Sequence, residues 1–190
     1  MNTIPGDRMS PPAKILLAAI LVGATSSSAL GQPDGFHMGP IIEAFGPVAT
    51  IERRVPIPEN AEFKVSFDIV DQAEAGTLNR SLVSGARFLN MHAEAGVPPD
   101  RMSLAFVIHG KAVHDVTNDA HYGAVTGASN ANLTLIKELT AHGAKIEVCG
   151  QSAAYHGVSV DDLAPGVSMS LSAMTSHALL QQDGYTLNPF

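Results

Sequence analysis

The spacing of apolar and polar residues changes from a strand period to a helix period and back again soon after residue 60. Apolar side chains occupy every second position from Phe63 to Ile69, as in a strand with one more buried face. Apolar residues then recur at helical spacing from Leu78 to His92, before the breaker run at residues 96–99. Residues 102–108 form a short apolar run, which is typical of a strand buried on both faces. This order predicts a βαβ unit.

The same alternation continues to the end of the chain. It predicts helix 131–142, strand 145–149, short helix 152–156, strand 167–171, helix 173–182 and strand 185–187. Five strands alternating with helices favour an α/β domain with three layers. Its mainly parallel five-stranded sheet is expected to carry helices on both faces. Loops that follow the strands then meet at the carboxyl edge of the sheet, where binding sites form in such folds.

Residues 1–31 are interpreted as a signal peptide. Ile15 to Ala24 form an uninterrupted apolar run, preceded by Arg8 and Lys14 and followed by small residues up to Gln32. A membrane-spanning helix needs about 20 apolar residues, so this run is too short to act as a stable membrane anchor. The sequence therefore predicts export across the inner membrane to the periplasm.

Residues 32–60 contain five prolines and three glycines and show no sustained period. Prolines at that density favour an extended arm. We therefore divide the chain into a signal peptide (1–31), a proline-rich N-terminal arm (32–60) and a folded domain (61–190).

The composition is that of a folded, acidic protein. Of the 190 residues, 45% are hydrophobic and 15% are charged, and the net charge is −7. This balance argues against a disordered chain and against a nucleic-acid partner bound through a basic surface. The chain has one cysteine, Cys149, so the sequence excludes an intramolecular disulfide and a multi-cysteine zinc site. A lone thiol in an oxidising compartment is expected to be buried, to be joined to a partner molecule or to take part in redox chemistry.

Cys149 is predicted to lie where a strand becomes a short helix. The free amides of that turn and the positive end of the helix can favour the thiolate over the thiol. A lowered thiol pKa suits nucleophilic or sulfur-carrying chemistry. Free cysteine is also among the most buried residue types, so a reactive thiol and a packing residue both remain interpretations of Cys149.

The segments around Cys149 resemble a known family. They are Phe106–Val113, Val148–Gly157, Asp161–Val167, Leu171–Thr175, Leu180–Tyr185 and Pro189–Phe190. In this order they are similar to the DsrE/DsrF-like family, and the resemblance covers roughly residues 63–190. It implies one α/β domain of flavodoxin-like topology, a kind of domain often assembled as homotrimers or hexamers. It also implies a persulfide on the cysteine matching Cys149, as in sulfur-relay subunits such as TusD. Those subunits tend to have basic residues where this chain has Tyr155-His156, and they work in the cytoplasm.

Eight histidines are many for this length. His109 ends a neighbouring predicted strand, which makes it the better candidate to stabilise the Cys149 thiolate or to move a proton. His156 lies about two helical turns beyond Cys149 and is a second candidate. Gly150 and Gln151, which directly follow Cys149, are further candidates for supporting its thiol. The alternative is that these histidines only form local hydrogen bonds.

The sequence does not support two other kinds of site. A metal site from His109, His114, His121 and Cys149 has suitable ligand types, but no HExxH or paired-cysteine spacing accompanies it. The segment 150–154 is one residue away from the GxSxG turn of serine hydrolases, with Ser152 as nucleophile and His177 downstream. It lacks the last glycine and an HGGG-type oxyanion loop. No metal and no cofactor are therefore predicted.

Two functional hypotheses follow. The first is an exported sulfur carrier or sulfurtransferase-type protein that binds sulfur as a persulfide on Cys149, with protein donors and acceptors of sulfur as partners. The second is a non-catalytic oligomer that holds a small molecule or a partner, with Cys149 as a structural residue. Both expect a homo-oligomer, a trimer or hexamer, because a small domain with a shared cleft is completed by its neighbours.

Overall fold

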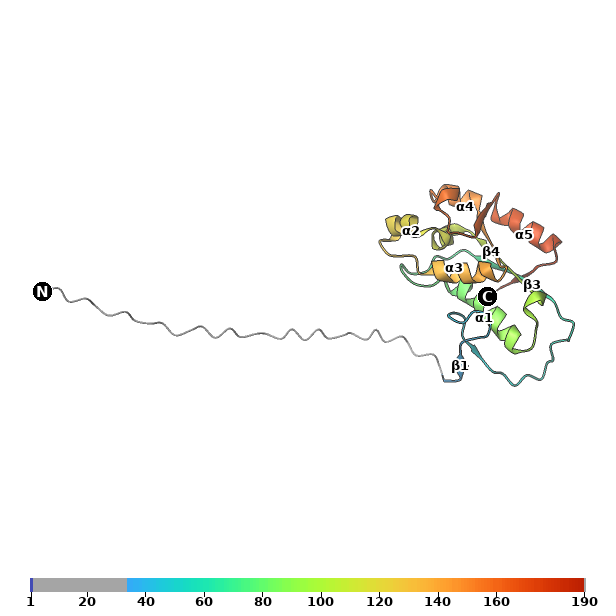
Figure 1. The fold of residues 1–190 in the computed structure, drawn as a ribbon. Coiled ribbons are helices and arrows are strands. Elements are labelled where there is room, and N and C mark those ends of the chain that lie inside the picture. The colour runs from blue at the N-terminus through green and yellow to red at the C-terminus, as the bar shows by residue number, and fades with distance from the viewer. Residues whose placement is uncertain (2–33, 190) are drawn as a thin grey trace. The chain divides into compact units, whose positions relative to one another are not determined.

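The computed structural model describes Met1 and residues 34–189 (Figure 1). The predicted signal peptide lies outside the described residues. The chain divides into two units, residues 1–31 and 32–190, and all described strands and helices belong to the second.

The strands are β1 (Phe36–His37), β2 (Val48–Ala49), β3 (Phe63–Ile69), β4 (Met102–Ile108), β5 (Lys145–Cys149), β6 (Val167–Ser170) and β7 (Thr186–Asn188). The α-helices are α1 (Arg80–Glu94), α2 (Asp119–Thr126), α3 (Asn132–Ala141), α4 (Gly150–Tyr155) and α5 (Ala173–Gln182). Three 3-10 helices complete the described elements: η1 (Pro99–Arg101), η2 (Gly110–Val116) and η3 (Val160–Asp162). The predicted elements are present with ends displaced by one or two residues, as expected because helix and strand ends are the least determined positions.

Five strands form one parallel sheet in the order β6-β5-β4-β3-β7. This confirms the predicted α/β fold with a five-stranded parallel sheet. The pairing of β3 with β4 runs from Phe63 opposite Met102 to Ile69 opposite Ile108. Because side chains alternate between the two faces of a strand, this register puts Phe67 and Phe106 on the same face, where their rings stack at 5.2 Å.

The two faces of the sheet are covered unequally (Figure 1). The main core lies on the face of Phe67 and Phe106, which is packed against α1 and α3. The other face has a smaller cluster, in which Ala105 and Val107 of β4 pack against Leu180 of α5. Helices therefore lie on both faces, but a single short helix covers the second. Polar side chains near the carboxyl ends of the strands on that face remain within reach of solvent.

The proline-rich arm is more ordered than the extended segment predicted from its composition. β1 and β2 pair antiparallel, and Ile42 between them is fully buried in the main core. The buried amide of Asn90 in α1 holds this segment: its Oδ1 accepts from the backbone N–H of Ile41 and of Ile42, at 3.1 and 2.8 Å. Its Nδ2 donates to three arm carbonyls, those of Ile42, Phe45 and Gly46. The Asn90 side chain thus supplies the hydrogen-bond partners that the backbone of a helix or strand would otherwise give to these N–H and C=O groups.

The segment between β4 and α3 also differs from expectation, since the sequence indicated only a loop there. It forms η2 and α2. The N-cap of α2 is Asn118, whose side chain accepts from the His121 backbone N–H, and its C-cap is Gly127 in the left-handed region. Both helices are short, so they show too few turns for a helical period to be recognised.

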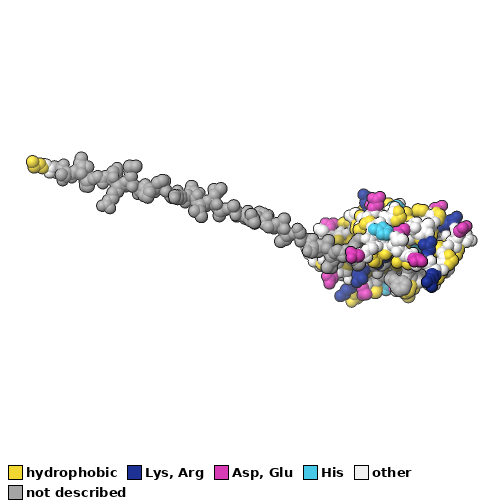
Figure 2. All heavy atoms as spheres, turned by 90° about the horizontal axis from the view of Figure 1, so that it is seen from below, with side chains coloured by type: hydrophobic (Ala, Val, Ile, Leu, Met, Phe, Trp, Pro, Cys, Tyr) yellow, Lys and Arg dark blue, Asp and Glu magenta, His cyan; other side chains and the backbone are white. Residues whose placement is uncertain are grey.

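The surface of the described domain mixes side-chain types. Figure 2 shows acidic, basic and apolar side chains interspersed over the visible face of the domain. Within residues 34–189, no helix is both long and apolar enough to cross a membrane.

Candidate functional site

Four consecutive strands of the sheet end at one open pocket of about 540 Å³. Its lining residues are Asp68, His109, Cys149, Gln151, Ser172, Ala173, Met174, His177, Gln181 and Leu187. Asp68 comes from β3, His109 follows β4, Cys149 ends β5 and Ser172 follows β6. The carboxyl ends of parallel strands lie at the same edge, which brings together residues that are far apart in the sequence. Cys149 and His109, the two candidates that the sequence places at the ends of neighbouring strands, both line this pocket.

Cys149 lies at the N-cap position of α4, and only 5% of its surface is exposed. The hydrogen-bond donors around its sulfur are the Ser152 hydroxyl and the backbone N–H groups of Ser152, Ala173 and Gln151. Burial raises the pKa of the thiol, but these nearby donors favour the thiolate and together hold the pKa below its ordinary value. The donors come from α4 and from the start of α5. The parallel pairing of β5 with β6 brings these two helix ends together at the sulfur.

The hydroxyl of Ser152 is oriented by a second contact. The backbone N–H of Gly110 donates to Ser152 Oγ at 3.1 Å, so the hydroxyl is free to direct its own proton to Cys149. Gly110 has a φ of +56°, and a side chain there would meet Val70 at 2.8 Å. The structure therefore gives Ser152 the geometry of a donor to the thiolate.

Replacing Ser152 by alanine is expected to raise the pKa of the Cys149 thiol, because the side-chain donor is removed while the backbone donors stay. The rate of alkylation by iodoacetamide at pH 7 should fall about three- to tenfold, as one pKa unit changes the thiolate fraction about tenfold. The measurement is the alkylation rate against pH. Ser84→Ala on α1, where the hydroxyl donates only to the Arg80 carbonyl, is the matched control. An unchanged profile in Ser152→Ala would contradict the assigned hydrogen bond.

Asp68 links two histidines in the same pocket. Its Oδ1 accepts from His177 Nε2 at 2.8 Å and from His109 Nε2 at 3.0 Å. Partial burial raises the pKa of the Asp68 carboxyl, but the hydrogen bonds from His177 and His109 outweigh it, so the pKa lies below its ordinary value. Asp68 is therefore ionised at neutral pH and holds both imidazoles by one oxygen.

Gly150 and Gln151 shape the turn after Cys149. An added Cβ on Gly150 would lie 2.6 Å from the Ser170 carbonyl oxygen, so only glycine lets β6 approach this closely. Gln151 Nε2 donates to the Leu171 carbonyl at 3.3 Å and lines the pocket. Both residues thus tie the cysteine turn to the end of β6.

The comparisons with known proteins concern the family and the fold of the chain. The model of the DsrE/DsrF-like family matches residues 64–189. The chain belongs to this family. DsrE-family proteins often work in sulfur-relay complexes, and the fold of this DsrE-like chain is one related to sulfur relay.

Two solved structures resemble the DsrE-like domain. A protein of unknown function, MTH1491, from Methanobacterium thermoautotrophicum, is 20% identical with a TM-score of 0.51, covering 67% of this chain and 98% of its own. The ychN protein from E. coli is 15% identical with a TM-score of 0.48, covering 66% and 99%. No curated protein matches the chain. At this identity the first likeness shows the fold alone.

His156 lies in a different environment of the DsrE-like domain. Its ring contacts His114 at 5.3 Å between centroids, and His114 stacks on His121 at 5.9 Å. None of these three lines the pocket of Cys149. The four potential metal ligands considered from the sequence are thus split between two places. No group of three or more His, Cys, Asp or Glu side chains within residues 34–189 is arranged to hold a metal ion.

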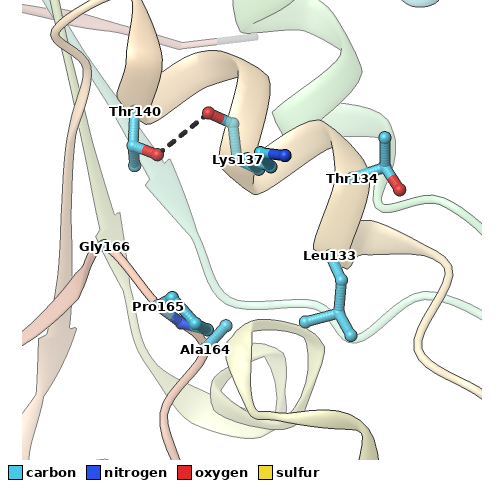
Figure 3. A pocket seen from close by; sticks show the side chains of 7 residues that line it. All are labelled: Leu133, Thr134, Lys137, Thr140, Ala164, Pro165 and Gly166. Atoms are coloured by element: carbon cyan, nitrogen blue, oxygen red, sulfur yellow. Dashed lines mark hydrogen bonds between the residues drawn. The ribbon is translucent and has the colours of Figure 1, made fainter.

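A further pocket, of about 470 Å³, lies between α3 and the turn before β6 (Figure 3). Leu133, Thr134, Lys137, Thr140, Ala164, Pro165 and Gly166 line it. Figure 3 shows the Thr140 hydroxyl turned to the Lys137 carbonyl, to which it donates at 3.1 Å. The lining offers no nucleophilic thiol and no histidine, so the pocket of Cys149 is the candidate functional site.

Proposed function

We propose that this DsrE-like protein carries sulfur as a persulfide on Cys149. The observation that carries the proposal is the position of Cys149 at the N-cap of α4 in a pocket open to solvent, with the Ser152 hydroxyl and three backbone N–H groups around its sulfur. A thiolate is the form of cysteine that attacks sulfur, and these donors favour it. The family's link to sulfur relay supports the same chemistry.

The reaction is a transfer of one sulfur atom. The Cys149 thiolate attacks the outer sulfur of a persulfide donor, R–S–SH, and forms a new S–S bond. The donor's own S–S bond breaks, and its electron pair leaves with R–S⁻. The product on the protein is Cys149–S–SH, so no external oxidant or reductant takes part. An acceptor then removes the outer sulfur by the same exchange.

We also propose that the protein is exported to the periplasm and acts as a homo-oligomer. The apolar segment at residues 15–24 supports export. Three large apolar side chains beside the pocket, Leu171, Met174 and Leu187, are exposed in the single chain. Exposed apolar groups close to a site support a partner subunit that covers them.

Incubation of the protein with polysulfide, or with thiosulfate and a sulfurtransferase, is expected to add one sulfur atom to Cys149. Intact-mass and peptide mass spectrometry measure the adduct, and cyanide should remove it. Cys149→Ser should gain no mass, whereas Ser84→Ala should react as the natural protein does.

The absence of any adduct, together with a native thiol that resists alkylation, would contradict the carrier function. That result would favour the second hypothesis, in which the same pocket binds a small molecule or a partner and Cys149 is a packing residue.

A further inference from the structure

The transfer of sulfur to Cys149 leaves a thiolate, R–S⁻, in the pocket, and the pocket contains two imidazoles that share one carboxylate oxygen. His109 and His177 both place Nε2 on Asp68 Oδ1, at 3.0 and 2.8 Å. They approach from different elements, since His109 directly follows β4 and His177 lies within α5. A carboxylate can accept from both Nε2–H groups at once, so each imidazole is held with Nδ1 directed away from Asp68.

The two histidines differ in what their other nitrogen can reach. Nδ1 of His177 is buried and has no hydrogen-bond partner, so it cannot exchange a proton with a molecule in the pocket. The His109 side chain is 29% exposed and lines the pocket, and its Nδ1 is the nitrogen that Asp68 leaves for a bound molecule. His109 is therefore placed to transfer a proton, and His177 to hold Asp68 in position.

The backbone of His109 belongs to the framework that orients the thiol. Its N–H donates to the Ile69 carbonyl at 2.9 Å, which anchors it to β3 beside Asp68. The next residue, Gly110, donates to the Ser152 hydroxyl that contacts Cys149. Cys149 and His109 are thus connected through two residues, Ser152 and Gly110.

We propose that His109 is the proton donor to the leaving thiolate in sulfur transfer, and that Asp68 and His177 are the positioning residues that hold it. This inference rests on the persulfide function of Cys149. The balanced step is Cys149–S⁻ with R–S–SH and the protonated His109, giving Cys149–S–SH, R–SH and neutral His109. Water returns the proton to His109 afterwards.

The proposal identifies the class of sulfur donor. A thiolate that leaves from an alkyl hydropersulfide is a strong base, so protonation makes its departure easier. A thiolate that leaves from an aromatic disulfide is a weak base and departs without a proton. A pocket with a held proton donor therefore suits small alkyl hydropersulfides, such as those of aliphatic thiols.

The experiment compares two reagents in single-turnover reactions of Cys149. An alkyl hydropersulfide tests the proton-dependent step, and an aromatic disulfide tests only the nucleophile. For His109→Gln we expect the first rate at pH 7 to fall about 100-fold, and for Asp68→Asn and His177→Gln about tenfold. The rate with the aromatic disulfide should stay within about twofold of the natural protein, because the Cys149 thiolate keeps its four donors. His142→Gln, which changes an exposed histidine at the end of α3, should alter neither rate.

The pH profile gives a second readout. With the alkyl hydropersulfide, the rate of the natural protein should fall more steeply with rising pH than that of His109→Gln, because only the natural protein uses a proton held in the pocket. Equal losses with both reagents in the Asp68 and His177 variants would mean a merely structural role and would overturn the proposal. Unchanged rates with both reagents would overturn it as well. In either case, formation of a persulfide by the natural protein would leave the proposed carrier function standing, whereas its absence would remove that function itself.

Discussion

Replacement of Asn90 by alanine is expected to lower the free energy of unfolding by roughly 3–5 kcal/mol and to release the N-terminal arm from α1. The Asn90 amide is fully buried and makes five hydrogen bonds to the backbone of residues 41–46, with distances from 2.8 to 3.1 Å. Alanine would leave those buried backbone groups without partners. The fully buried Ile42 would then leave the main core as the arm opens.

Urea denaturation measures the loss of stability, and limited proteolysis within residues 34–60 measures the release of the arm. Arg80→Ala changes an exposed residue of the same helix and should have little effect on either. A loss below about 1 kcal/mol with a protease-resistant arm would show that the arm is held by apolar contacts instead.

Replacement of Gly150 by alanine is expected to destabilise the protein by about 1–3 kcal/mol and to slow alkylation of Cys149. The added methyl group would lie 2.6 Å from the Ser170 carbonyl oxygen and 3.3 Å from that of Leu171. Both atoms belong to the backbone, so the end of β6 must move away from the cysteine turn. Because the Ala173 N–H that contacts the sulfur follows this segment, the thiol pKa should rise.

Gly123→Ala provides the matched control for this substitution. Gly123 lies inside α2, and an added Cβ would meet its nearest neighbour, the Ala128 carbonyl oxygen, at an ordinary 3.6 Å. Alanine should therefore stabilise the protein by about 0.5–1 kcal/mol through helix propensity and leave alkylation unchanged. If the close contact at Gly150 is real, the midpoint of thermal unfolding should shift in opposite directions in the two variants, and alkylation should slow only in Gly150→Ala. Equal behaviour of the two variants would contradict it.

The sequence predicted a large part of the candidate site. Cys149 and His109 each follow an apolar run read as a strand, and parallel strands bring their carboxyl ends to one edge. Asp68 was missed, although it occupies a polar position near the end of the alternating strand 63–69. That position is a signal that could have been noticed. His177 lies 109 residues from Asp68, and nothing in the local pattern indicates their contact.

His156 shows the opposite case. Its closeness to Cys149 in the sequence suggested support for the thiol, but α4 places it against His114, outside the Cys149 pocket. The arm is a similar example, because its prolines indicate an extended backbone but not the single buried amide of Asn90 that holds it. In both cases the partner lies in another element, and a local pattern carries no information about it.

The sequence by itself determined the five strands of the sheet and the helices α1, α3, α4 and α5, because the periods of two and of 3.6 residues are properties of neighbouring residues. It also determined that the one thiol lies between a strand and a helix. The tertiary structure alone decided the strand order β6-β5-β4-β3-β7. It also decided that α5 packs on the face of the sheet opposite the main core. Those choices bring His177 to Asp68 and the Ala173 amide to Cys149. They depend on the packing of whole elements, whose free energy is a sum over many distant contacts that no single segment contains.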